Sequence, residues 1–234
     1  MGTSLRSIVN DRILKDVVES CYEKGKYKVL VLDQLATKII SSCCKMADII
    51  SNNILLVEDL HKSRQPMPGK EAIYFLTPTD KSIRDLLNDF NSKPVQYLRA
   101  NIFFTDTCPT ALFQEIGSAP IGKYIKNLQE LNIAYIPLER SVFTLNQPKV
   151  LKSTYRETKS ASLTSLTNMI DPIDRIAEQL STVCASLGEY PSVRIFKPPN
   201  ASDPHFEKVE RLANLVVTKM NSYKADDPNL VKVL

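Results

Sequence analysis

The chain has 234 residues, 43% of them hydrophobic and 24% charged, which is an ordinary balance for a soluble globular protein. Its net charge of +4 comes from scattered lysines and arginines without a basic run or interleaved aromatic residues, so we expect no nucleic-acid partner. No apolar run approaches the roughly 20 residues that span a bilayer, so we expect any membrane association to pass through a partner.

The N-terminal part of the chain predicts a helix, a strand and a second helix. Apolar residues four positions apart predict an amphipathic helix over residues 8–22: Val9, Ile13, Val17 and Cys21. The apolar run 29–32 is typical of a strand buried on both faces, although a buried helical segment is an alternative. After Asp33 the apolar period changes, which predicts a helix with one apolar face: Leu35, Ile39, Cys43 and Met46. Asp33 is therefore expected at the carboxyl end of a strand, where partners dock on open α/β sheets.

Further strands and helices follow before residue 138. The strands are expected at 54–57, 72–76, 100–105 and 133–136, with residues 61–70 as an exposed loop. One helix is expected after an N-cap at Thr79, and a second from Pro109, capped by Thr107 or Cys108. A third is expected from Pro120, with an inward face of Tyr124, Ile125, Leu128 and Leu131. Strands that alternate with helices indicate an α/β fold, an open five-stranded parallel sheet flanked by helices.

The pattern changes beyond Leu138, so we place a domain boundary near Pro137. The first α/β domain is expected over residues 1–137, and part of a second α/β domain over 138–234. In the second domain, short strands are expected at 142–145 and 192–196. A helix is expected from Pro172 to Gly188, and a long helix is marked by Phe206, Val209, Leu212, Val216 and Met220.

The sequence contains few of the motifs that catalysis requires. None of the six glycines stands in a dinucleotide-binding or phosphate-loop motif, and neither histidine has a metal ligand at a suitable spacing. The sharpest enzyme hypothesis is a magnesium-dependent phosphotransfer enzyme, in which Asp33, Glu58 and Asp106 meet at the carboxyl edge of the sheet. Against it, Asp33 lacks the second nearby aspartate of such nucleophile loops, and acids at strand ends more often cap the next helix.

Two other groups of residues bear on function. Basic residues follow the expected strand ends (Lys38, Lys45, Lys62 and Arg64), and they form either a solvated face or a docking surface for an acidic partner. Five cysteines, without metal-ligand spacing, indicate reduced packing residues and a cytosolic compartment. We therefore expect neither a metal site nor a cofactor.

Several long segments of the chain resemble the SM family of Sec/Munc-type syntaxin-binding proteins. They include KVLVLDQLATKIISSCCKMADI, VEDLHKSRQPMP, FFTDTCPTALF and LQELNIAYIPLE. The resemblance covers almost the whole chain and is strongest over residues 5–145. It is closest to the N-terminal portion of the neuronal, plasma-membrane branch that serves exocytosis. Members of the family are much longer than this chain, so the resemblance implies that the second domain is incomplete here.

The resemblance implies a non-enzymatic protein that binds syntaxin and regulates SNARE assembly in vesicle docking and exocytosis. The implied partners are syntaxin, in its closed form and through its N-terminal peptide, and the SNARE complex. The implied location is cytoplasmic, peripheral at the plasma membrane through syntaxin. No catalytic residue and no cofactor is implied.

Two contact surfaces are implied on the first domain. The first, here called the charged surface, would contact closed syntaxin and consists of Asp33, Lys38, Lys45 and Glu58. The family's acidic residue before a nearby proline is Gln65 here, so that contact departs from the family pattern. The second, here called the peptide pocket, would take the syntaxin N-terminal peptide and consists of Phe113, Ile125, Leu128 and Glu130. General burial habits alone favour an ordinary core position for the three apolar residues of this pocket.

Overall fold

The computed structural model describes residues 4–148, 171–196, 204–226 and 231–233. The chain divides into two compact units, Met1–Thr144 and Leu145–Leu234. This division lies beyond the boundary expected at Pro137, because a small hairpin stays with the first unit. The hairpin pairs β6 (Ile136–Pro137) antiparallel with β7 (Phe143–Thr144), and β6 packs against the first two helices.

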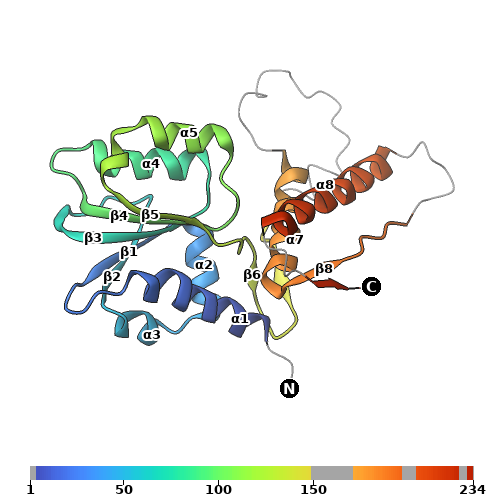
Figure 1. The fold of residues 1–234 in the computed structure, drawn as a ribbon, viewed down its shortest axis with the longest axis horizontal. Coiled ribbons are helices and arrows are strands. Elements are labelled where there is room, and N and C mark those ends of the chain that lie inside the picture. Colours follow the sequence, from blue (N-terminus) through green and yellow to red (C-terminus); the bar gives the residue numbers. More distant parts are fainter. Residues whose placement is uncertain (1–3, 149–170, 197–203, 227–230, 234) are drawn as a thin grey trace. The chain divides into compact units, whose positions relative to one another are not determined.

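The first unit is built on a parallel sheet of five strands in the order β2-β1-β3-β4-β5 (Figure 1). The strands are β1 (Lys28–Leu32), β2 (Ile54–Asp59), β3 (Met67–Leu76), β4 (Tyr97–Phe104) and β5 (Ile125–Glu130). All four pairings between neighbouring strands are parallel. The predicted fold class, an open five-stranded parallel sheet flanked by helices, is therefore confirmed.

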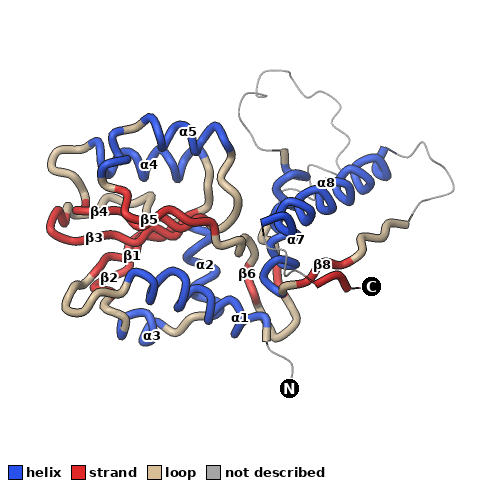
Figure 2. Tube along the Cα trace, in the orientation of Figure 1, coloured by secondary structure: helices blue, strands red, loops and turns tan. Residues whose placement is uncertain are grey.

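Helices cover both faces of this sheet (Figure 2). On one face lie α1 (Leu5–Arg12), extended by helical turns to Cys21, α2 (Gln34–Cys43) and α3 (Met46–Ser51). On the other lie α4 (Asp80–Asn91), α5 (Thr110–Ser118) and the short turn η3 (Pro120–Lys123). Thr79 caps α4 as predicted, because its side chain accepts a hydrogen bond from the Ser82 amide at 3.2 Å.

The core of the first unit follows from the strand pattern. Val29 and Val31 belong to the apolar cluster beneath α4 and α5, while Leu30 between them is also fully buried. Because successive side chains of a strand point to opposite faces, β1 is covered on both sides, as its continuous apolar run predicted. The predicted face of the first helix is confirmed by the complete burial of Val9 and Ile13.

The fifth strand is not the one predicted. Residues 133–136 do not belong to the parallel sheet, and only Ile136 takes part in the small hairpin. The helix expected from Pro120 is a single short turn that leads into β5, which supplies the fifth strand. The apolar spacing of Ile125 and Leu128 imitated a helical face, because a bulge in β5 brings residues three apart onto one side of the sheet.

Three element boundaries also differ from the prediction. The helix expected to run to Met46 ends at Cys43, because Cys44 is extended, and Met46 begins α3 with 48% of its surface exposed. The loop expected over 61–70 is shorter, since β3 already begins at Met67. Pro109 is the N-cap of α5 and not its first helical residue, so neither Thr107 nor Cys108 is the cap.

The second unit contains two helices and a pair of short strands. They are α7 (Pro172–Leu187), β8 (Glu189–Pro191), α8 (Pro204–Asp226) and β9 (Val231–Val233). The predicted stop at Gly188 is confirmed by its left-handed φ of 67°. The strand expected at 192–196 is wrong, because β8 precedes it and pairs in parallel with β9. Residues 149–170 lie outside the described residues.

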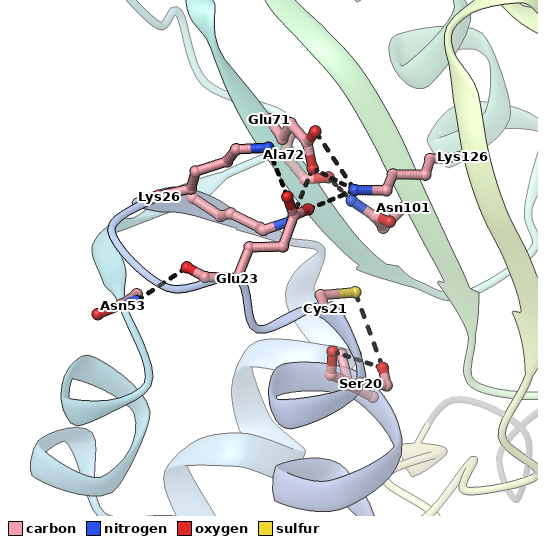
Figure 3. A network of polar contacts seen from close by, with 11 residues as sticks. Ser20, Cys21, Glu23, Lys26, Asn53, Glu71, Ala72, Asn101 and Lys126 are labelled. Atoms are coloured by element: carbon pink, nitrogen blue, oxygen red, sulfur yellow. Dashed lines mark hydrogen bonds and ion pairs between the residues drawn. The ribbon is translucent and has the colours of Figure 1, made fainter.

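A network of charges closes the amino end of the sheet in the first unit (Figure 3). Lys28 is buried at the start of β1 and contacts Glu23 at 2.9 Å and Glu71 at 2.7 Å. Lys126 in β5 pairs with the same two carboxylates, and Lys26 adds a contact to Glu23 at 2.5 Å. These contacts connect the turn before β1 to β3 and β5. The five residues that make them are here called the amino-end network: Glu23, Lys26, Lys28, Glu71 and Lys126.

Candidate functional site

Asp33 is a buried helix cap. Its side chain is 4% exposed, and one carboxylate oxygen accepts a hydrogen bond from the Ala36 amide at 2.9 Å. The other oxygen accepts from the Thr77 amide at 2.6 Å and from the Ser82 hydroxyl at 3.4 Å. Asp33 thus joins the start of α2 to the loop after β3 and positions α2. The structure does not place its carboxylate at the surface, where the resemblance would have it contact a partner.

Lys38 and Lys45 lie at the surface on the α1–α3 side of the sheet. Lys38 is on the exposed side of α2, and Lys45 precedes the first residue of α3. Among the residues that the structure describes, neither lysine has an ion-pair partner. Lys45 also lines an open cavity of about 400 Å³ that reaches across to Arg6 of α1. Positive charge without a partner at this surface is suited to binding an acidic group.

Glu58 faces the other side of the sheet. It pairs with Val31 in the β1–β2 register, and Val31 belongs to the cluster beneath α4 and α5. Its carboxylate accepts a hydrogen bond from the Tyr97 hydroxyl, which in turn accepts one from Arg64 at 3.3 Å. Arg64 makes a two-point ion pair with the Asp89 carboxylate, at 2.8 and 2.9 Å. Glu58 is therefore held by a network that continues into α4.

Arg64 and Asp89 are a pair that sequence reasoning missed. The sequence placed Arg64 among the basic residues of a solvated or docking surface, whereas its side chain is only 7% exposed. Burial raises the pKa of Asp89, although the Arg64 guanidinium opposes that rise. The two residues lie 25 positions apart in the sequence, so no local spacing could have connected them.

The charged surface therefore does not lie on one face of the molecule. Lys38 and Lys45 are on the side of α2 and α3, and Glu58 is on the side of α4. Strand β2, which carries Glu58, is an edge strand of the sheet and separates the two sides. A single partner that contacts all three residues has to reach around this edge.

The peptide pocket is organised by a bulge in β5. The register with β4 is Ala100 with Ile125, Asn101 with Asn127, Ile102 with Leu128 and Phe104 with Glu130. Lys126 is skipped, so Ile125, Leu128 and Glu130 all face the side of the sheet that α4 and α5 cover. Ile125 and Leu128 are partly buried and pack against the core cluster on that side. Because β5 is the other edge strand, these residues lie at the margin of the core.

Phe113 provides an exposed aromatic side chain on the same side. It lies on α5 and is 51% exposed, whereas its neighbour Leu112 is 7% exposed and belongs to the core cluster. The ordinary core position that burial habits favoured for Phe113 is therefore wrong. An apolar ring left half-exposed at the surface is the arrangement that a hydrophobic anchor of a ligand needs.

Glu130 connects β5 to the start of α5. Its Oε1 accepts a hydrogen bond from the Cys108 amide at 2.8 Å, which fixes the loop that leads into α5. Burial, and secondarily the negative charge of Glu130, raises the pKa of the Cys108 thiol to about 11. Glu130 therefore has a structural contact in addition to the partner contact that the resemblance implies.

The structure gives no support to the magnesium alternative. Both carboxylate oxygens of Asp33 already accept hydrogen bonds from the protein, and Asp106 is buried with a hydrogen bond from Thr105 at 2.6 Å. Within the described ranges, no three His, Cys, Asp or Glu side chains are grouped so that they could hold a metal ion. His61 instead contacts Asp85, with Nδ1 and Oδ2 2.6 Å apart.

None of the helices in the described part of the chain is long and apolar enough to span a membrane.

Comparison with known proteins identifies the family. The model of the Sec1 family matches residues 28–231, which is most of the chain. The chain belongs to the Sec1 family. Among relatives, protein transport protein sec1 of Dictyostelium discoideum is 34% identical over 97% of this chain and 37% of that protein. Protein transport Sec1a of Arabidopsis thaliana is 32% identical over 94% of this chain and 32% of that protein.

A solved structure agrees with this membership. The crystal structure of the Unc18–syntaxin 1 complex from Monosiga brevicollis matches with a TM-score of 0.79 and 30% identity. The match covers 98% of this chain and 38% of that chain. The present Sec1-family chain therefore spans roughly a third of the length of the relatives it matches. The resemblance noted from the sequence segments is confirmed.

Proposed function

We propose that this chain is the N-terminal part of a syntaxin-binding regulator of SNARE assembly in vesicle docking and exocytosis. It acts by binding, without catalysis or a cofactor, in the cytoplasm and at the plasma membrane through syntaxin. The observation that carries the proposal is the likeness to the Monosiga brevicollis Unc18 chain, at 30% identity over nearly the whole length of this chain. Membership of the Sec1 family supports it independently.

We assign closed syntaxin to the charged surface. Lys38 and Lys45 are the exposed contacts, and Glu58 contributes from beyond the edge strand β2. Asp33 belongs to this surface indirectly, because its hydrogen bonds set the start of the helix that carries Lys38. On this assignment closed syntaxin contacts both sides of the β2 edge, which explains why the residues are spread over two faces.

We assign the syntaxin N-terminal peptide to the peptide pocket. Phe113 would hold an apolar side chain of the peptide, with Ile125 and Leu128 as the partly exposed floor. Glu130 would pair with a basic residue of the peptide while it retains its contact to the Cys108 amide. The two assignments place the two binding modes on separate helices and separate edge strands of one unit.

Charge reversal tests the charged surface. In the Lys45→Glu and Glu58→Lys double variant, we expect about tenfold weaker binding of folded, closed syntaxin, with unchanged binding of the isolated N-terminal peptide. Lys45→Glu alone is the cleaner variant, because Glu58 also accepts a hydrogen bond from Tyr97. Lys81→Glu on α4 is the matched control, since Lys81 is also exposed. Equal losses in the syntaxin and peptide titrations would contradict the two-surface assignment.

The second unit, Leu145–Leu234, completes the proposal as the first part of a second α/β domain. Its short parallel strands β8 and β9 pair only with each other among the described residues. Two strands are fewer than an independently stable sheet needs, which is consistent with further strands from elsewhere in a longer chain. Amide hydrogen exchange should therefore be much faster in β8 and β9 than in β1 and β3. Equal protection of all four strands would mean that the second unit is complete by itself.

A further inference from the structure

Two thiols lie side by side where α2 ends. The Sγ atoms of Cys43 and Cys44 are 3.7 Å apart, although consecutive residues of a helix point in directions about 100° apart. The separation is short because Cys43 is the last residue of α2 and Cys44 is already extended, with φ −97° and ψ 144°. The other cysteines (Cys21, Cys108 and Cys184) are also unpaired, and they lie elsewhere in the sequence.

The pair is reachable from solvent and lies among positive charges. Cys43 lines the open cavity of about 400 Å³ between α1 and the α2–α3 junction. The same cavity is lined by Arg6 of α1 and by Lys45, with Asp48 as its acidic residue. Cationic neighbours favour the thiolate over the thiol, and the thiolate is the form that oxidants attack.

The two thiols differ in pKa. A hydrogen bond from Cys44 lowers the pKa of Cys43 against the opposing effect of burial, and Ser42 and Arg6 lower it further. The hydrogen bond with Cys43 raises the pKa of Cys44, and burial and then the charges of Cys43 and Asp48 raise it further. By contrast, burial raises the pKa of Cys21, Cys108 and Cys184. The pKa of the Cys43 thiol is thus lowered and that of the adjacent Cys44 thiol is raised, so Cys43 is the sulfur that loses its proton more readily.

We propose that Cys43 and Cys44 form a reversible oxidation site for hydroperoxides. The Cys43 thiolate attacks the O–O bond of hydrogen peroxide, which leaves a sulfenic acid on Cys43 and releases hydroxide. The Cys44 thiol then attacks the sulfenic sulfur, an S–S bond forms, and water leaves. The two sulfurs together lose two electrons and peroxide gains them. A dithiol reductant reverses the reaction by thiol–disulfide exchange.

Oxidation would act on the α2–α3 junction. Cα atoms of adjacent residues are about 3.8 Å apart, which is shorter than an ordinary disulfide prefers, so the bond is strained and readily reduced. Ring closure would change the backbone directly before Lys45, one of the two exposed lysines of the charged surface. We therefore expect the oxidised chain to bind closed syntaxin more weakly. This consequence, unlike the oxidation itself, rests on the proposed function.

Mass spectrometry of the oxidised chain tests the site. Cleavage after lysine releases residues 39–45, a peptide that contains Cys43 and Cys44 and no other cysteine. After limited hydrogen peroxide, we expect this peptide to lose two hydrogen atoms and to regain them with dithiothreitol. Oxidation of this peptide should be at least about tenfold faster than oxidation of Cys108, because a larger fraction of the Cys43 thiol is deprotonated.

Three variants assign the roles within the site. Cys44→Ser should stop the reaction at a sulfenic acid on Cys43, which a cyclic dione probe captures. Cys43→Ser should leave residue 44 no more reactive than Cys108. Arg6→Gln should slow oxidation by at least about twofold, while Arg84→Gln, an exposed arginine on α4, should not. Circular dichroism confirms that each variant is folded.

The outcomes separate this proposal from the proposed function. Oxidation of residues 39–45 no faster than that of Cys108, or disulfides only between molecules, would overturn the oxidation site whatever the chain binds. A disulfide in that peptide with unchanged syntaxin binding would keep the site and overturn its effect on the charged surface. If the reduced chain does not bind syntaxin at all, the proposed function fails while the oxidation site stands on the mass spectrum.

Discussion

At the amino end of the sheet, charges neutralise one another, whereas on the α2–α3 surface they remain open to a partner. The amino-end network joins three lysines to two glutamates: Lys26, Lys28, Lys126, Glu23 and Glu71 (Figure 3). On α2 and before α3, Lys38 and Lys45 are exposed, and in the described part of the chain neither has an ion-pair partner.

The difference shows how one residue type serves two purposes in one unit. A buried lysine is tolerated only with opposite charges around it, so Lys28 ties three segments of the fold together. An exposed lysine loses little by remaining solvated, and its charge is available to a partner. Local sequence does not distinguish the two cases. The register of the sheet does, because it sets Lys28 directly opposite Glu71.

The largest expected effect comes from breaking the amino-end network at its centre. Lys28→Met leaves Glu71 and Glu23 with fewer positive partners at a site where Lys28 is only 3% exposed. We expect the unfolding free energy of the first unit to fall by about 3 kcal/mol, at the lower end for a broken buried pair because Lys126 remains. Hydrogen exchange of the β1 and β3 amides measures this for the first unit alone.

The control applies the same substitution to the other region. Lys38→Met removes an exposed lysine from α2, and we expect a change below about 0.5 kcal/mol. The distinction between the buried and the exposed lysine would be wrong if Lys38→Met lowered the unfolding free energy as much as Lys28→Met. It would equally be wrong if both variants left exchange unchanged.

A second comparison tests the same distinction with apolar side chains. Leu112 and Phe113 are neighbours on α5, with exposed fractions of 7% and 51%. Leu112→Ala should lower the unfolding free energy by about 2.5 kcal/mol through the cavity it leaves in the core. Phe113→Ala should cost less than about 1 kcal/mol in stability but weaken peptide binding about thirtyfold, as the loss of an aromatic anchor does.

Denaturant titration and calorimetry with the peptide separate the two effects. If Phe113→Ala destabilises the fold as much as Leu112→Ala and the folded fraction still binds peptide normally, residue 113 is not part of the peptide pocket. A loss of affinity in Leu112→Ala larger than in Phe113→Ala would exchange the roles of the two residues.

Much of the fold was predictable wherever one local signal dominated. The apolar run of β1, the Thr79 cap of α4 and the Gly188 stop of α7 each follow from the chemistry of a few neighbouring residues. Strand β5 was not predictable in this way. Its bulge puts Ile125 and Leu128 on one face at the spacing of a helix, and a bulge depends on pairing with β4.

The candidate site depended on more than local pattern. The residues of both surfaces came from the family resemblance, because a half-exposed Phe113 contradicts the usual behaviour of its residue type. The side of the sheet that Glu58 faces follows from its register with Val31. This register cannot be read from the sequence alone. Likewise, the pairing of Arg64 with Asp89 appears only when the loop after β2 meets α4.

The smallest expected effect concerns the pH dependence of the amino-end network. Burial alone would raise the pKa of Glu71, but hydrogen bonds and charge from Lys28 and then Lys126 outweigh it, and the pKa is lowered from 4.5. The pKa of Glu23 is also lowered, by hydrogen bonds from Lys126, Lys26 and Lys28. A carboxylate with a depressed pKa in the folded state stabilises the fold above its unfolded pKa. That contribution is lost as the pH falls through the folded pKa.

Glu71→Gln should therefore be less stable than the unaltered chain at neutral pH, by about 1.5 kcal/mol for a charged hydrogen bond. The gap should narrow as the pH falls below 4.5, because protonation then removes the same charge from the unaltered chain. Urea midpoints followed by circular dichroism across this range measure the gap. Glu115→Gln, at an exposed position on α5, is the matched control and should leave the profile unchanged. A gap for Glu71→Gln that stayed constant as the pH fell would mean that residue 71 acts through its shape and not its charge.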